Sequence, residues 1–130
     1  MSEPAASAEN ASGACSVQTA LCELVASGAG VEAAVVVSLD GLPMASHGAS
    51  FDADRLGALC GELATLARTV AQEFGRGAVD ETWVRGDRGV AVLVAAGSAA
   101  ILAVLARDDA KLGLLRLEAR RAARLVASMV

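Results

Sequence analysis

The sequence contains very few aromatic residues: two Phe, one Trp and no Tyr among 130 residues. Proteins that bind single-stranded nucleic acid stack the bases on aromatic rings, and this chain has no set of rings for that role. Its net charge of −4 and pI of about 4.9 also differ from those of nucleic-acid-binding domains, which carry a basic stripe. We therefore expect no nucleic-acid partner, and a core built from Ala, Val and Leu.

Cysteine is also scarce, and its spacing predicts neither a metal site nor a disulfide framework. Cys15, Cys22 and Cys60 are odd in number and match no zinc-binding pattern. Cys22 and Cys60 fall on apolar faces of expected helices, where cysteine acts as a small hydrophobic residue. The sequence therefore predicts no metal ligands and a reducing, cytoplasmic compartment.

Catalytic signatures are missing. The chain has no GxxxxGK[ST], GxGxxG or GxSxG motif. His47 is the single histidine, and nothing orients a triad with Ser46 and Asp40. Asp108-Asp109 is interpreted as a helix cap rather than a metal site. We therefore predict no catalytic residues, no cofactor, and a protein that is not an enzyme.

Two segments bear on targeting and on membranes. Residues 1–14 are rich in Ala and Ser and lack the basic start and apolar run of a signal peptide, so we predict a disordered tail followed by one domain over 15–130. Residues 89–106 carry no charge and approach the length of a membrane span. Gly97-Ser98 in their middle favours two short strands joined by a turn. We therefore expect no direct membrane insertion.

Hydrophobic periodicity predicts the element order α-β-β-α-β-β-β-α, with the long middle helix on one sheet face and the other two helices on the opposite face. Asp40-Gly41 indicates a two-residue hairpin turn, and Pro43 places the strand after it at a sheet edge. Asp52 is a candidate helix cap. The expected helices cover residues 16–27, 52–75 and from Asp108 or Asp109 to the terminus, and the expected strands cover 31–39, 42–47, 78–86, 89–96 and 99–106.

The middle helix has two lines of residues. We predict that its core stripe is made of Leu56, Leu59, Cys60, Leu63, Ala67, Val70 and Phe74. The second line is Gly57, Gly61, Ala64 and Arg68. Two glycines inside a helix cost about 1 kcal/mol each relative to alanine, which indicates a close backbone neighbour. That neighbour is either a second copy of the chain or the chain's own sheet, and we assign this second line to a dimer interface.

The third strand is the other candidate for self-association. If it lies at a sheet edge, its backbone groups are open to pairing. A two-fold axis near Trp83 would set Glu81 opposite Arg85 of a second chain, and such a pair contributes about 0.2–1 kcal/mol. The alternative is a charged edge that stays solvated. We predict a homodimer that uses Val79, Glu81, Trp83 and Arg85.

Charge is distributed unevenly along the chain. Residues 1–54 hold seven acidic residues and no Lys or Arg. The last helix carries five basic residues and Glu118 as its single acidic one. Such asymmetry either steers a partner or gives a solvated helix face. The basic residues are Lys111, Arg116, Arg120, Arg121 and Arg124.

Two stretches give the chain a family resemblance, VEAAVVVSLDGLPMAS at 31–46 and KLGLLRLEARRAARLV at 111–126. With the element order, the region over about 16–128 resembles the roadblock/dynein light chain family. The resemblance implies an α+β fold of the profilin/roadblock type, an α/β/α sandwich around a five-stranded antiparallel sheet in the order 2-1-5-4-3. It also implies dimers formed by the third strand and the middle helix.

Members of that family act as scaffolds or regulators of small Ras-like GTPases, and some bacterial members stimulate hydrolysis by a partner. The sequence therefore predicts a non-catalytic homodimeric adaptor that binds a small Ras-like GTPase and modulates its GTP hydrolysis. Arg55 and Arg68 are the arginines that an activating role would use. The alternative is a ligand-sensing α/β module in a signalling pathway. The predicted GTPase surface is Arg55, Glu62, Thr65, Thr69 and Gln72.

Overall fold

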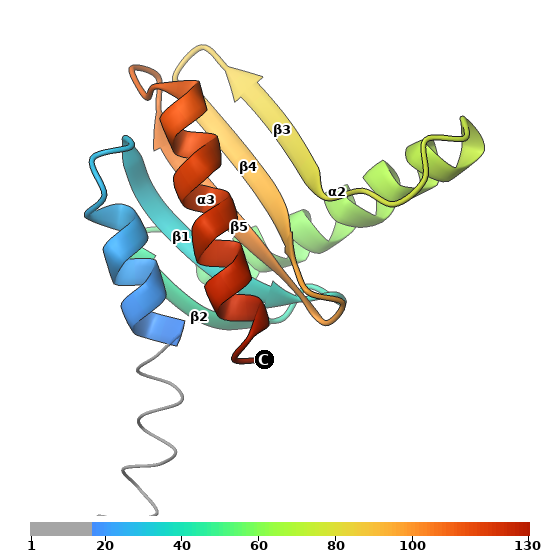
Figure 1. Ribbon diagram of the computed structural model, residues 1–130, viewed down its shortest axis with the longest axis horizontal. Helices are drawn as coiled ribbons and strands as arrows, with labels where there is room; N and C mark the ends of the chain where they lie inside the picture. The colour runs from blue at the N-terminus through green and yellow to red at the C-terminus, as the bar shows by residue number, and fades with distance from the viewer. Residues whose placement is uncertain (1–16) are drawn as a thin grey trace, which may run out of the picture.

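The computed structural model describes residues 17–130, so the predicted tail over 1–14 and Cys15 lie outside the described part of the chain. The order of elements agrees with the prediction (Figure 1). A helix covers residues 17–25, and is followed by β1 (Val31–Ser38), β2 (Pro43–Gly48), α2 (Ala53–Glu73), β3 (Glu81–Gly86), β4 (Gly89–Ala96), β5 (Ala100–Arg107) and α3 (Leu112–Ala127).

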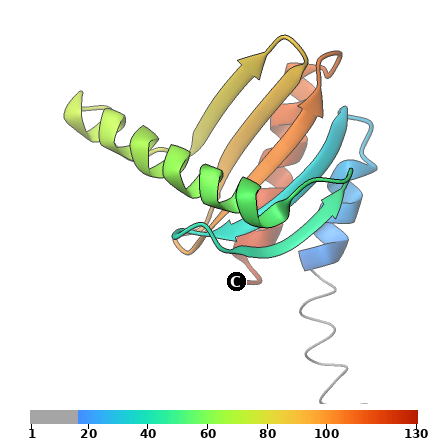
Figure 2. The same ribbon diagram turned by 180° about the vertical axis from the view of Figure 1, so that it is seen from behind.

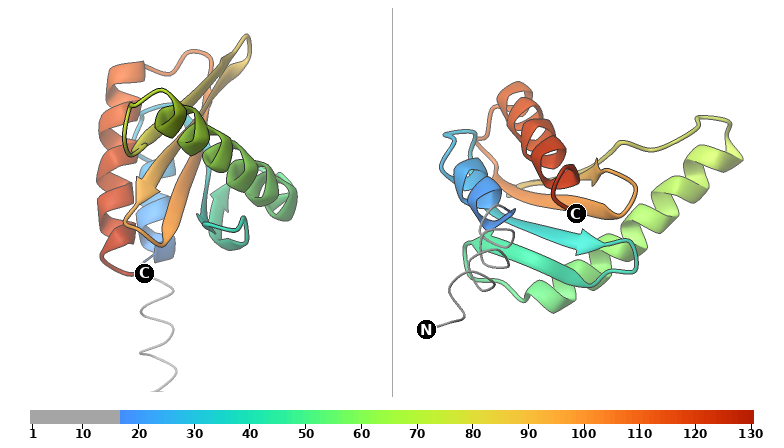
Figure 3. Two further views of the ribbon diagram at one scale, coloured as in Figure 1. Left: turned by 90° about the vertical axis from the view of Figure 1, so that its right-hand side faces the viewer. Right: turned by 60° about the horizontal axis from the view of Figure 1, so that its bottom comes forward.

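The five strands form one antiparallel sheet in the order β2-β1-β5-β4-β3, which confirms the expected topology. The N-terminal helix and α3 lie side by side on one face, and α2 crosses the other face (Figures 1 and 3). The central strands β1 and β5 are covered on both sides. Their sequences are accordingly made almost entirely of Val, Ala, Leu and Ile rather than alternating with polar residues.

The core has two layers. The larger one lies under the N-terminal helix and α3, where Leu21, Leu102 and Leu115 are fully buried. The smaller one lies under α2 and is built around Val35, Val37 and other residues with short side chains. Within residues 17–130 no polar or charged residue is buried. Both layers therefore rely on apolar burial.

The uncharged run over 89–106 forms β4, a turn and β5, as predicted. Gly97 in the turn has a φ of 73°, a left-handed conformation that glycine adopts without strain. None of the helices in the described part of the chain is both long enough and apolar enough to cross a membrane.

One local prediction was confirmed, and two others named the right element but misplaced its bounds. Asp52 caps α2, and its side chain accepts a hydrogen bond from the Arg55 backbone N–H at 3.1 Å. However, α3 begins after Lys111 without a side-chain cap, and Asp109 instead pairs with Arg107 at 3.4 Å. The connection between β1 and β2 spans residues 39–42 rather than two residues, and the Ser38 N–H donates to the Leu42 carbonyl oxygen across it at 2.9 Å.

Candidate functional site

The two glycines inside α2 pack against the chain's own backbone. A Cβ on Gly57 would lie 2.7 Å from the carbonyl oxygen of Gly41, and a Cβ on Gly61 would lie 3.0 Å from the Gly41 Cα. Ala64 is also buried. The close neighbour that the glycines indicated is therefore the turn after β1 of the same chain. Of the two neighbours that the sequence allowed, the structure contains the one within the chain rather than a second copy. This corrects the assignment of Gly57 and Gly61 to a dimer-facing line; the place of Ala64 in a dimer interface stays a prediction.

The predicted core stripe of α2 was right for Leu56 and Leu63, which pack against the core, and wrong for three other large residues. Cys60 is buried, but Leu59 is 51% exposed, Val70 52% and Phe74 71%. The small residues let α2 approach the sheet, so the large ones project sideways and outward. The C-terminal half of α2 also extends beyond β3, where this chain's sheet ends (Figure 2). An apolar stripe on α2 is thus left largely open to solvent.

The two edges of the sheet differ. At β2, Pro43 has no N–H to donate, and the Ser46 carbonyl oxygen accepts a hydrogen bond from Nε2 of Gln18 at 2.9 Å. At the other edge, β3 pairs with β4 only, as the sequence predicted. Val84 on β3 is 46% exposed. The sheet therefore has one blocked edge and one open edge.

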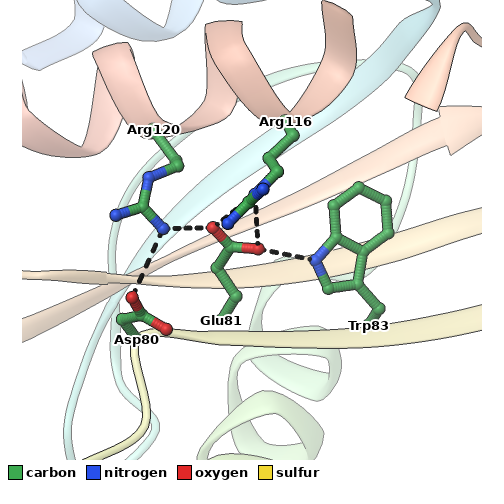
Figure 4. A network of polar contacts seen from close by, with 5 residues as sticks. All are labelled: Asp80, Glu81, Trp83, Arg116 and Arg120. Atoms are coloured by element: carbon green, nitrogen blue, oxygen red, sulfur yellow. Dashed lines mark hydrogen bonds and ion pairs between the residues drawn. The ribbon is translucent and has the colours of Figure 1, made fainter. Parts of the chain in front are cut away.

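A charged cluster joins the open edge strand to α3 (Figure 4). The Glu81 carboxylate accepts hydrogen bonds from Nε of Arg116 at 2.9 Å, from Arg120, and from the Trp83 indole N–H at 3.0 Å. Arg120 also pairs with Asp80 at 3.4 Å. The predicted pairing of Glu81 with Arg85 of a second chain stays a prediction, but this carboxylate already has partners within its own chain.

The cluster sets the ionisation of Glu81. Burial raises the pKa of its carboxyl group, but hydrogen bonds from Trp83, Arg116 and Arg120 outweigh burial and lower the pKa from 4.5 to about 2. Glu81 is therefore charged at neutral pH and holds two basic residues of α3 against β3. Sequence analysis identified the arginines as an excess of charge, but the contact spans 35 residues of chain and no local pattern signals it.

Two of the remaining residues of the predicted interface, Val79 and Arg68, line a small hollow of about 290 Å³ on the α2 side of the sheet. Val79 precedes β3 and lines this hollow, whose other lining residues include Leu93 and Ile101. Arg68 reaches its rim and donates to the Thr65 hydroxyl at 3.3 Å. Arg85 is exposed on β3. The surface of the hollow is mostly apolar, although Arg68, Asp80 and Glu81 also line it.

The predicted GTPase surface is exposed on α2 at all five positions, Arg55, Glu62, Thr65, Thr69 and Gln72. Three of these residues, Glu62, Thr65 and Thr69, line a groove of about 710 Å³ beside the turn after β1. Sequence analysis missed Leu39, which also lines this groove, because it follows an apolar run and reads as the buried end of a strand. It is 44% exposed.

One contact joins residues that the sequence treated separately. The Cys22 Sγ lies 3.5 Å from Nδ1 of His47. Within the described residues no group of three or more His, Cys, Asp or Glu side chains is arranged to hold a metal ion. We interpret the pair as a contact between the N-terminal helix and β2.

Comparisons with known proteins agree with this architecture. A crystal structure of a Roadblock/LC7 domain from Streptomyces avermitilis is 32% identical, covers 84% of this chain and 92% of its own, and has a TM-score of 0.79. The gliding protein MglB from Thermus thermophilus is 22% identical, with 90% of each chain covered and a TM-score of 0.84, a likeness of fold.

Among curated proteins, the uncharacterized protein MJ1340 of Methanocaldococcus jannaschii is 36% identical over 101 residues, which are 77% of this chain and 88% of that protein. The family model described as Roadblock/LC7 domain matches residues 17–106, from the N-terminal helix almost to the end of β5, and does not include α3. This chain therefore belongs to the Roadblock/LC7 domain family.

Proposed function

We propose that the protein is a homodimeric adaptor that binds a small Ras-like GTPase and modulates its GTP hydrolysis. The observation that carries the proposal is the open apolar stripe of α2 on a helix that extends beyond its own sheet. Membership in the Roadblock/LC7 family supports the GTPase as the partner. Both features are those of a domain that works through protein contacts.

The dimer follows from two-fold symmetry. Pairing β3 with β3 of a second copy, about an axis through the middle of the strand, continues the sheet under the overhanging half of α2. The part of the second copy's sheet that lies under α2 in this arrangement is lined by Val84, Ala91 and Leu105, which are neighbours in register across β3, β4 and β5. These residues lie on the same face as Leu93, which packs under α2.

Each α2 then covers half of its own sheet face and half of the partner's face. The two-fold axis places the end of one α2, with Val70 and Phe74, over the half that the partner's own α2 leaves uncovered. An isologous contact of this kind buries the same apolar residues twice. It also gives the open β3 edge its missing neighbour.

The opposite, polar side of α2 remains free for the GTPase. A regulator can act by aligning the GTPase's own residues, because phosphoryl transfer depends mainly on positioning and electrostatics. Of the two arginines considered, Arg55 is exposed and its side chain has no ion-pair partner within residues 17–130, whereas Arg68 is tied to Thr65. Arg55 is therefore the better placed to reach a bound GTPase.

Two measurements test the proposal. Sedimentation equilibrium should give a dimer mass at micromolar concentration. Each Ras-like GTPase encoded in the same genome, purified and loaded with GDP or a non-hydrolysable GTP analogue, should then be titrated against the dimer, followed by single-turnover hydrolysis. We expect one GTPase to bind and its hydrolysis rate to change. A monomer, or a dimer that binds none of them, refutes the proposal.

A further inference from the structure

The groove beside α2 has a mixed apolar and acidic lining. It lies between the turn over residues 39–42 and the polar side of α2. Two leucines on its walls are exposed, Leu39 at 44% and Leu66 at 62%. Leucines this open beside a groove leave apolar surface for another molecule to cover.

The charge of the groove has one sign. Asp40 and Glu62 are its ionisable lining residues, and no Lys or Arg lines it. Glu62 has no ion-pair partner within the described residues, and Asp40 accepts a hydrogen bond from the Ser38 hydroxyl. The carboxylates therefore attract a cation and repel an anionic ligand.

We propose that this groove binds a protein segment in which an apolar side chain stands next to an Arg or Lys. The leucines cover the apolar side chain, and Glu62 and Asp40 receive the cationic group. That the segment belongs to the GTPase rests on the proposed function; the chemistry of the segment rests on the groove alone.

The groove is compatible with the dimer. Glu62, Thr65 and Thr69 follow one another at helical spacing on the polar side of α2. Phe74 and the open sheet face that we assign to the second copy lie away from that side. Two-fold symmetry therefore leaves one groove open on each subunit.

A displayed library of random peptides, panned against the full chain, tests the chemistry without assuming a partner. We expect enriched peptides to carry an apolar residue beside Arg or Lys. Leu66→Ser should weaken their binding about tenfold, because it removes apolar contact without adding charge. Glu62→Lys should weaken it about threefold or more and reduce its salt dependence.

The chain offers matched controls. Leu117 is 59% exposed on α3 and Glu23 is exposed on the N-terminal helix, both on the other side of the sheet. Leu117→Ser and Glu23→Lys should therefore leave peptide binding unchanged. Thr65→Arg, which places a cation in the groove, is a second blocking variant if Leu66→Ser disturbs the dimer mass. Enriched peptides without a cation, the enrichment of none, or equal binding to every variant overturns the proposal.

The same variants separate this proposal from the function on which it draws. If a GTPase binds wild type and Thr65→Arg equally well, the groove is not its docking site, while the adaptor function stands. If no GTPase binds but the basic and apolar peptides bind and are blocked by Thr65→Arg, the groove stands and the GTPase assignment fails.

Discussion

Replacing Phe74 with alanine isolates the contribution of the overhanging end of α2 to dimer formation. Phe74 is 71% exposed in the single chain, so its side chain contributes little to the fold itself. Burying a Phe side chain completely contributes about 1.5–3 kcal/mol. Scaling by the exposed fraction gives about 1–2 kcal/mol for each copy, and two-fold symmetry doubles this to about 2–4 kcal/mol per dimer.

A loss of about 1.4 kcal/mol corresponds to a tenfold weaker affinity, so the dimer dissociation constant should rise about 30-fold to several hundred-fold. Sedimentation equilibrium over a range of concentrations measures this change. Thermal unfolding of the variant at low concentration should match that of the wild-type monomer. Leu117→Ala is the matched control, since Leu117 is 59% exposed on α3, across the sheet from α2.

A Phe74→Ala dimer whose affinity stays within about threefold of wild type would show that the second sheet does not lie under this end of α2. Equal weakening by Leu117→Ala would show that the assembly uses the other face of the molecule. Either result refutes the two-fold arrangement about β3, although the fold and the family assignment would stand.

Three further predictions concern single residues. Glu81 has a lowered pKa of about 2 in the folded chain, so its contribution to stability is complete above pH 4.5 and is lost as the pH falls toward 2. Glu81→Gln should therefore lower the free energy of unfolding by about 1–2 kcal/mol at pH 7 and by progressively less in this acid range, as measured by urea unfolding. Gly57→Ala should destabilise the fold by about 2 kcal/mol despite a gain of about 1 kcal/mol in helix propensity, as measured by thermal melting. Gly113→Ala should be neutral or stabilising, because a Cβ there meets nothing within 4 Å. Equal effects of the two substitutions would contradict the close approach of Gly57 to Gly41. Burial raises the pKa of the Cys60 thiol, whereas Cys22 is only partly buried. Mass spectrometry after alkylation at pH 8 should therefore find Cys22 modified and Cys60 protected. Equal labelling of the two would contradict the burial of α2 on the sheet.

The fold was predictable because local signals agreed with one another. The apolar runs of β1 and β5, Pro43 at an edge and the Asp52 cap each pointed to an element that the structure contains. On α3 the apolar face of the sequence is the buried face, since Leu115, Ala119 and Val126 are buried. A helix that lies flat on a sheet reveals its buried side through its hydrophobic pattern.

The pattern failed on α2 because hydrophobicity there does not mark the buried side. Gly57 and Gly61 are buried because a larger residue would keep the helix away from the turn after β1, and Ala64 packs against the sheet. Phe74 and Val70 are exposed because the helix continues past its own sheet. A hydrophobic pattern assigns such residues to the core, whereas in this chain they form the exposed apolar stripe that we propose a second copy covers.

The charged cluster that joins Glu81 to Arg116 and Arg120 of α3 has a consequence for the edge strand. A strand with only one neighbour usually frays, and ordering it costs entropy when a second strand arrives. Here Arg116 and Arg120 of α3 hold Glu81 at the start of β3 before a second strand reaches the open edge. A strand that adds to this edge therefore meets a neighbour that is already anchored, and the anchor is α3, which lies outside the residues that the family model matches.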